Sequence, residues 1–411
     1  MASPATIKGR PSKVLIVLGS PGIGDAVEAF PVFEIVREHW PDVYLVAASF
    51  NKSQSAMLEM SPHLSARTML VEHRGIKRGW RAIKGCGPNF KAMQGFDIIL
   101  FLYKKVITLP MVLTARLTGA NVVYKHDYHY RDTRQDPYSD FPEHVFFQIV
   151  ATRLLGLPLA RLREPRLSLS VQDQQFGEEF CKSRGLGHRP LVMLNTQSYA
   201  LCRGWGIERY ACLANALVES GADVLINGWA DSQVAEFRSV AHKLKSGVFL
   251  AENRSPRELA AVVGKCDLHI GDPSGPASLA MAMGIPTIIL QGPGEHEYPG
   301  QDRPGPLWWP RGPKYEVLSK IDWCQLNMGG ACRCWEPETR RHLIKSVMNP
   351  LGLWDPWRTA RRKVMKALGM SRHGSAIAAD GYPCLEAITV EAVVAAARRQ
   401  LCRASRQVNA S

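Results

Sequence analysis

A glycine-rich turn near the start of the chain, VLGSPGIGDAVEAFP at residues 17–31, carries an acidic residue where catalysis is possible. The apolar run Val14–Leu18 precedes the turn and a helical pattern restarts at Asp25, which predicts a strand, a tight loop and a helix N-terminus. A helix N-terminus favours an ionised carboxylate, and such a group at the edge of a cleft can accept a proton from a substrate hydroxyl. The alternative is that Asp25 only caps the helix.

Two nucleotide-binding motifs fit this turn poorly. Gly19, Gly22 and Gly24 match the dinucleotide fingerprint loosely, and the following strand, VYLVAASF, has no acidic residue at its end to hold a ribose. No Gly-Lys-Ser/Thr follows, which excludes a phosphate-loop NTPase. A nucleotide-dependent oxidoreductase therefore stays only as a disfavoured alternative.

The second half of the chain repeats the strand–turn–helix pattern in HIGDPSGPASLAMAMGIPTIIL at residues 269–290. Its turn, Asp272 to Gly275, places backbone N–H groups and a hydroxyl at the start of a helix of small residues, which suits a diphosphate. Arg203 follows the first strand of this half, where a cation could neutralise a leaving diphosphate. The alternative is an ordinary surface arginine.

A group of cysteines near the C-terminus could hold a structural metal ion through four thiolates. Its members are Cys324, Cys332, Cys334 and Cys384. The Cys-x-Cys spacing is tighter than that of a usual zinc knuckle, so free buried thiols are the favoured alternative. Three histidines, His126, His129 and His144, are assigned to a polar loop near an acceptor site rather than to a metal.

Short apolar runs that alternate with helical patterns must position these residues, and they predict two parallel sheets with crossover helices. In the first half we expect strands at Val14–Leu18, Val43–Ala47, Thr68–Val71, Asp97–Leu102 and Asn121–Tyr124, and helices at Asp25–His39, Val106–Leu117 and Glu143–Leu155. In the second half we expect strands at Leu191–Asn195, Asp223–Ile226, Val248–Leu250, Asp267–Ile270 and Thr287–Leu290, and helices at Ile207–Glu219, Ser232–Leu244, Pro256–Gly264 and Gly275–Gly284.

The chain is predicted to have two doubly wound α/β domains that face each other across a cleft, because open parallel sheets bind ligands beyond the carboxyl ends of their strands. The segment Arg161 to Gln172 has the composition of an interdomain connection. We expect an N-terminal domain at 1–165, a C-terminal domain at 166–300, a Pro-, Trp- and Cys-rich extension at 301–383, and a terminal helix within 384–411 with Thr389 as its N-cap.

Composition predicts a soluble globular protein, with 46% hydrophobic and 21% charged residues and no run of membrane-spanning length. No secretory signal is recognisable, so a cytoplasmic location is expected.

The net charge of +14 favours an anionic partner. The run WDPWRTARRKVMKALGM at residues 354–370 resembles a basic amphipathic helix, which predicts peripheral contact with the inner membrane face, or else a solvated surface helix. Nucleic acid is not expected as a partner, because no nucleic-acid-binding motif is present.

Five stretches in order resemble glycosyltransferase family nine, the ADP-heptose:lipopolysaccharide heptosyltransferases. They are KVLIVLGSPGIGDAVEAFPVFEIVREHWPD, HVFFQIVATRLLGLP, NTQSYALCRGWGIERYACLANALVESG, GDPSGPASLAMAMGIPTIILQGPG and CLEAITVEAVVAAA. The resemblance implies the GT-B fold of two facing Rossmann-like domains. It also implies inverting transfer of a sugar, with heptose expected, from a nucleotide-diphosphate donor such as ADP-heptose to a lipopolysaccharide or other cell-envelope acceptor, without a catalytic cofactor.

The same resemblance implies roles for individual residues. Asp25 corresponds to the catalytic base, and Arg203 to the basic residue that steadies the diphosphate. The residues implied to bind the nucleotide sugar are Gly22, Gly24, Thr196, Trp205, Asp272, Ser274, Gly275 and Pro276. The family's turn usually reads Asp-Thr-Gly-x-x-His, whereas this chain has Pro273-Ser274-Gly275-Pro276-Ala277-Ser278, so a catalytically silent member that acts in binding or assembly is the second alternative.

Overall fold

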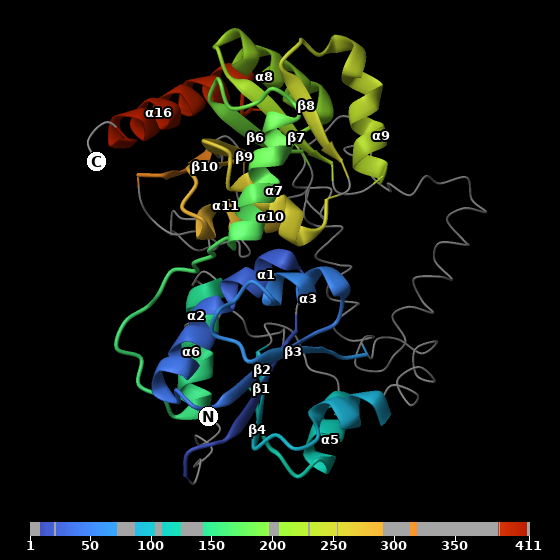
Figure 1. Ribbon diagram of the computed structural model, residues 1–411, viewed down its shortest axis with the longest axis vertical. Helices are drawn as coiled ribbons and strands as arrows, with labels where there is room; N and C mark the ends of the chain where they lie inside the picture. The colour runs from blue at the N-terminus through green and yellow to red at the C-terminus, as the bar shows by residue number, and fades with distance from the viewer. Residues whose placement is uncertain are drawn as a thin grey trace, which may run out of the picture. The chain divides into compact units, whose positions relative to one another are not determined.

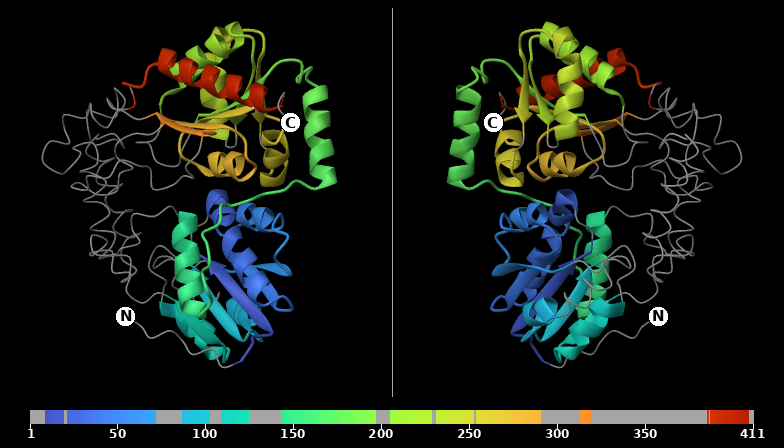
Figure 2. Two further views of the ribbon diagram at one scale, coloured as in Figure 1. Left: turned by 90° about the vertical axis from the view of Figure 1, so that its left-hand side faces the viewer. Right: turned by 90° about the vertical axis from the view of Figure 1, so that its right-hand side faces the viewer.

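The computed structural model describes residues 9–19, 22–71, 87–102, 109–124, 143–196, 205–228, 231–252, 254–290, 313–318, 385 and 387–408. The chain divides into two compact units, with a boundary between Pro165 and Arg166. The described C-terminal residues 387–408 belong to the second unit. Figures 1 and 2 show the helices and strands of each unit.

The first unit is a parallel sheet with strand order β3-β2-β1-β4-β5. Its strands are β1 (Lys13–Leu18), β2 (Tyr44–Ser49), β3 (Ala66–Met69), β4 (Ile98–Leu102) and β5 (Asn121–Tyr124). Its helices are α1 (Ile23–Glu28), α2 (Phe30–His39), α3 (Lys52–Leu58), α5 (Leu109–Leu117) and α6 (Glu143–Leu155), with a further helical turn at residues 87–93. β1 and β4 are buried nearly throughout, as expected for central strands covered on both faces.

Alternate residues of these strands face different helices. Leu15, Val17 and Phe101 pack in one core cluster with Met111 and Ala115 of α5. On the unit's other helices, α2 and α6 contact each other, and α6 also contacts α1 and β4. The unit is therefore a three-layer α/β structure in which α1 directly follows the central strand β1.

The second unit is also a parallel sheet, with strand order β11-β10-β9-β6-β7-β8. Its strands are β6 (Leu191–Asn195), β7 (Asp223–Gly228), β8 (Val248–Glu252), β9 (Leu268–Gly271), β10 (Thr287–Leu290) and β11 (Tyr315–Leu318). Its helices are α7 (Val171–Lys182), α8 (Ile207–Glu219), α9 (Asp231–Val240), the 3-10 turn η4 (Ala241–Lys243), α10 (Pro256–Val263), α11 (Gly275–Ala282) and α16 (Val390–Val408). The edge strand β11 lies inside the segment that the sequence assigned to an extension.

Two helix layers cover this second sheet. Val192, Leu194 and Ile270 pack with residues of α8 and α16 in one large core cluster, and α16 lies beside α8 (Figure 1). Ile289 packs instead with Ala277 and Met281 of α11. Thr389 caps α16 as predicted, since its Oγ1 accepts a hydrogen bond from Ala392 N–H at 3.2 Å.

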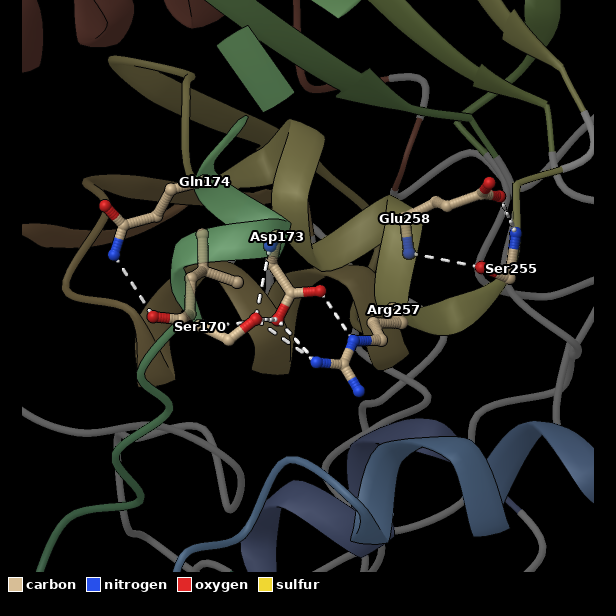
Figure 3. Close-up of polar contacts among 7 residues, drawn as sticks. Ser170, Asp173, Gln174, Ser255, Arg257 and Glu258 are labelled. Carbon is tan, nitrogen blue, oxygen red and sulfur yellow. Dashed lines mark hydrogen bonds and ion pairs between the residues drawn. The ribbon is translucent and has the colours of Figure 1, made fainter. Parts of the chain in front are cut away.

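Helices α7 and α10 begin side by side and are joined by an ion pair between a buried aspartate and a partly exposed arginine. Ser170 and Ser255 cap the two helices through capping boxes with Asp173 and Glu258 (Figure 3). Arg257 then donates from Nε to Asp173 Oδ1 at 2.5 Å and from Nη2 to Asp173 Oδ2 at 3.1 Å. Gly177 permits this close packing, because a Cβ there would lie 2.6 Å from the carbonyl oxygen of Ala261.

The segment that the sequence identified as an interdomain connection is held by both units. Arg163 forms ion pairs with Glu34 and Glu38 of α2, and its backbone N–H donates to Gln148 Oε1 at 2.8 Å. Leu167 N–H donates to the Ala282 carbonyl at 2.9 Å in the second unit. The contacts of this segment therefore pass from the first unit at Arg163 to the second unit at Leu167. None of the described helices is long and apolar enough to cross a membrane.

Candidate functional site

Asp25 lies in the first turn of α1, directly after the central strand β1. Gly22 is the N-cap, so the helix begins two residues before Asp25 rather than at it, and Asp25 is the third helical residue. Its Oδ2 accepts a hydrogen bond from Gly22 N–H at 2.8 Å. The residue is partly exposed, whereas its neighbours Gly24 and Ala26 are buried. The Asp25 carboxylate is thus oriented by the backbone N–H of Gly22 and remains accessible to solvent.

Gly22 is required for this arrangement. A Cβ at this position would lie 2.4 Å from Asp25 Oδ2, which is closer than a carbon and an oxygen normally approach. Helix α3 supports the same loop, because Gln54 is fully buried and its Nε2 lies 3.5 Å from the Gly22 carbonyl oxygen. Asn51 caps α3 by accepting from Gln54 N–H at 2.8 Å.

The second unit gathers polar side chains where its central strands end. Asn227 Nδ2 donates to Asn195 Oδ1 at 2.9 Å, and Asn195 Nδ2 donates to Ser274 Oγ at 2.9 Å. Ser274 Oγ donates in turn to the Asp272 carbonyl oxygen at 3.1 Å. These residues follow or end β6, β7 and β9, which is where open parallel sheets bind ligands.

Ser274 and the first two residues of α11, Gly275 and Pro276, are partly exposed. Ser274 is the N-cap of the helix, and Pro276 has no N–H to offer. The N–H groups of Ala277 and Ser278 bond back to the Ser274 carbonyl at 3.1 and 3.2 Å. The backbone N–H groups left to bind an anion here are therefore those of Ser274 and Gly275, at the N-cap and first position of α11, and not those of the whole first helical turn.

Asp272 is fully buried, in contrast to the nucleotide contact that the resemblance implied. Its Oδ1 accepts a hydrogen bond from Tyr210 OH at 2.8 Å. Burial raises the pKa of Tyr210 well above its usual value, and the neighbouring Asp272 carboxylate raises it further. The tyrosine therefore stays protonated and acts as a donor, and the contact ties the turn to α8.

Trp205 is also fully buried. Its indole N–H donates to the Ile388 carbonyl oxygen at 2.8 Å, and its ring packs edge-on against Tyr210 with centroids 5.2 Å apart. In this structure it anchors the segment that leads into α16. Thr196, which follows β6, is nearly buried as well.

Several predicted residues lie outside the described part of the chain. They are Arg203, the cysteines Cys324, Cys332, Cys334 and Cys384, His126 and His129, and the basic run at residues 354–370. Among the described residues no group of three or more His, Cys, Asp or Glu is placed to hold a metal ion. His144 is buried beside Glu164, with Nε2 3.3 Å from Oε2.

The sequence analysis missed Asn195, Asn227 and Tyr210. The two asparagines carry a signal that could have been used, because each directly follows an apolar run, Leu191–Leu194 or Val224–Ile226, near the carboxyl end of its strand. Tyr210 carries no such signal, since it resembles any core aromatic residue of an amphipathic helix.

Two α/β units, each with a parallel sheet and with polar residues after its central strands, have the architecture of the GT-B fold, and comparison with solved structures supports this fold. A glycosyl transferase family 9 structure from Veillonella parvula aligns over 96% of this chain and 98% of its own, with a TM-score of 0.66 and 19% identity. The E. coli ADP-heptose LPS heptosyltransferase II aligns over 75% of this chain and 90% of its own, with a TM-score of 0.56 and 16% identity.

Residues 139–334 match the family model described as Glycosyltransferase family 9 (heptosyltransferase), which confirms the resemblance. The chain is therefore similar to the glycosyltransferases of family 9 over just under half of its length, and it is a glycosyltransferase. The lipopolysaccharide core heptosyltransferase OpsX of Haemophilus influenzae is 22% identical over 293 residues, which are 68% of this chain and 78% of that protein. The family match includes Arg203, Trp205 and the turn at Ser274, and it begins after Asp25.

Proposed function

We propose that this chain is an inverting glycosyltransferase that moves a heptose from a nucleotide-diphosphate donor to a lipopolysaccharide or related cell-envelope acceptor. The observation that carries the proposal is the backbone-held, partly exposed carboxylate of Asp25, combined with the family match of the second unit. Two relatives point to the substrates, namely the core heptosyltransferase OpsX and the E. coli ADP-heptose LPS heptosyltransferase II.

In the proposed reaction Asp25 accepts the proton of the acceptor hydroxyl, and the hydroxyl oxygen attacks the anomeric carbon. The bond from that carbon to the diphosphate oxygen breaks on the opposite face, so the configuration inverts and a nucleoside diphosphate leaves. The first unit takes the acceptor in this proposal, and the second takes the nucleotide sugar.

Charge on the leaving diphosphate would be stabilised by Arg203 and by the turn at Ser274 and Gly275. Preorganised donors of this kind often make the largest contribution to catalysis. Because Arg203 and the turn at Ser274 and Gly275 would stabilise the negative charge on the leaving diphosphate, the proposed reaction needs no catalytic cofactor. ADP is the nucleotide favoured by the resemblance, and ADP-heptose is therefore the first donor to test.

A panel of nucleotide sugars tests the proposal. The purified chain is incubated with ADP-heptose, UDP-sugars and GDP-sugars, with and without a deep-rough lipopolysaccharide acceptor, and nucleotide release and the anomeric configuration of the product are measured. We expect release that depends on the acceptor, with ADP-heptose preferred and the configuration inverted. Arg203→Ala should weaken donor binding, since a charge-assisted contact contributes roughly 1.5–3 kcal/mol. Binding of a donor without turnover on any acceptor would instead support the catalytically silent alternative.

A further inference from the structure

The two strand-end asparagines are directly opposite each other. Asn195 on β6 pairs with Asn227 on β7 and, on its other side, with Gly271 on β9, so all three positions share one face of the sheet. Because Gly271 has no side chain, the Asn195 amide can pass over β9 to reach Ser274. A Cβ on Gly271 would lie 2.9 Å from the Cβ of Asn195 and 2.6 Å from its carbonyl oxygen. The glycine therefore keeps this path open.

The proton count of Ser274 decides what its hydroxyl can do for a ligand. A serine hydroxyl has one proton to donate. Its oxygen accepts from Asn195 Nδ2, and an amide nitrogen can only donate. The serine proton is then donated to the Asp272 carbonyl oxygen. No proton is left for a phosphate oxygen, so a diphosphate at this turn must be held by other donors.

Asn227 orients the Asn195 amide. Its Nδ2 donates to Asn195 Oδ1, which directs Nδ2 of Asn195 toward Ser274. Asn227 is almost fully buried, and its Oδ1 has no hydrogen-bond partner among the residues that the structure describes. A buried acceptor without a donor lowers stability, whereas the Nδ2 of the same side chain makes the hydrogen bond to Asn195 Oδ1. The role of the amide at this position is therefore the orientation of Asn195 through that hydrogen bond.

We propose that Asn195 and Asn227 are positioning residues that use the Ser274 hydroxyl to lock the turn before α11, so that backbone N–H groups of the turn hold the donor diphosphate. This inference rests on the proposed function, because it assumes that the turn binds a nucleotide sugar. It assigns Ser274 a role that differs from the direct phosphate contact implied by the family resemblance.

The experiment measures affinity and stability together, with ADP and UDP as probes in calorimetry and thermal unfolding as the second readout. Asn227→Leu should lower the nucleotide affinity, because it removes the donor that orients the Asn195 amide. Asn195→Ala and Ser274→Ala should each weaken nucleotide binding on the order of tenfold. The double variant should have about the same affinity as the single variant that binds less tightly, because both substitutions remove the same hydrogen bond between Asn195 and Ser274.

Ser255→Ala is the matched control, because Ser255 caps α10 in the same unit. It should lower the melting temperature and leave the nucleotide affinity unchanged. Additive losses for Asn195→Ala and Ser274→Ala would overturn the inference, as would an Asn227→Leu variant that loses stability but keeps its affinity. A wild-type chain that binds neither nucleotide and releases none from any donor would overturn the proposed function itself, which separates the two failures.

Discussion

The carboxylate of Asp25 accepts a hydrogen bond from the backbone N–H of Gly22, with 2.8 Å between Gly22 N and Asp25 Oδ2. This contact caps α1 and at the same time fixes the direction of a partly exposed carboxylate. The capping role and the catalytic role are therefore compatible, although the sequence presents them as alternatives. Substitutions at the two residues separate the roles.

Asp25→Asn should nearly abolish sugar transfer while the fold is kept. Asparagine can accept the same hydrogen bond from Gly22, so the cap is retained, but its amide cannot take a proton from the acceptor. Loss of a general base costs on the order of a hundred- to ten-thousand-fold in rate. Initial rates and ADP affinity are measured beside Asp42→Asn, a control at an exposed aspartate of the same unit. Turnover within a few-fold of wild type would remove Asp25 from catalysis.

Gly22→Ala should reduce transfer with a small effect on stability. The new methyl group meets Asp25 Oδ2, which lies at the end of a side chain and can rotate away, so the clash is relieved by loss of the hydrogen bond. A lost cap contributes about 1 kcal/mol to the free energy of unfolding. Gly87→Ala is the control, because a Cβ there meets nothing within 4 Å. Full activity of Gly22→Ala would show that the orientation of Asp25 is unimportant.

Trp205→Phe should destabilise the second unit without a direct loss of nucleotide affinity. The change removes the donor to Ile388 O and leaves a gap beside Tyr210, which together cost about 2–4 kcal/mol. Urea unfolding and ADP calorimetry measure the two effects, and Trp40→Phe provides a comparable loss of volume in the first unit. If affinity falls while stability is unchanged, the role of Trp205 is contact with the ligand and not support of the segment that leads into α16.

The Asp173–Arg257 pair should make stability depend on acid pH. Burial alone would raise the pKa of Asp173, but hydrogen bonds from Arg257 and Ser170 outweigh it and hold that pKa below its ordinary value. A depressed pKa in the folded state stabilises the fold above the unfolded value of about 3.9, and this contribution is lost as pH falls through the folded pKa.

Arg257→Gln should therefore lower the free energy of unfolding at neutral pH. Because the arginine side chain is 40% exposed, the loss is discounted for solvent screening to on the order of 1–2 kcal/mol. Urea unfolding near pH 7 and near pH 3 should show the gap to wild type narrowing in acid. Arg238→Gln, whose pair with Glu252 is exposed on both sides, should change little at either pH. A gap that is the same at both pH values would contradict the assignment to Asp173.

The basic run at residues 354–370 should bind anionic vesicles. Each cation near such a surface contributes about 1 kcal/mol, and the attraction weakens as salt shortens the screening length. Replacing Arg361, Arg362 and Lys363 by glutamine should reduce sedimentation with anionic vesicles and leave that with neutral vesicles unchanged. A control triple variant removes the same charge elsewhere, at Arg238, Lys243 and Lys245. Equal losses in both variants would indicate a general charge effect instead of a binding helix.

Periodicity in the sequence determined most of the central elements. The strands Leu191–Asn195 and Thr287–Leu290 and the helices Glu143–Leu155 and Ile207–Glu219 have the predicted bounds, because a buried strand or an amphipathic helix shows its pattern locally. The predicted helix Asp25–His39 is instead two helices that meet at Ala29, with Pro31 in the first turn of the second. Helices α3 and α7 were missed, because short or polar helices have weak patterns.

Tertiary structure decided the rest. The edge strand β3 begins two residues earlier than predicted, because its position follows from pairing with β2, where Ala66 lies opposite Val46. The chain by itself shows a glycine-rich turn with Asp25 and a second turn with Ser274, which was enough to find the two candidate sites. It does not show that Asp272 and Trp205 are buried, or that Ser274 is bonded to an asparagine 79 positions away. The hydrogen bond between Asn195 and Ser274 forms only in the folded sheet. Pairing of the parallel strands β6 and β9 brings their carboxyl ends together, although many residues separate the two strands in the sequence.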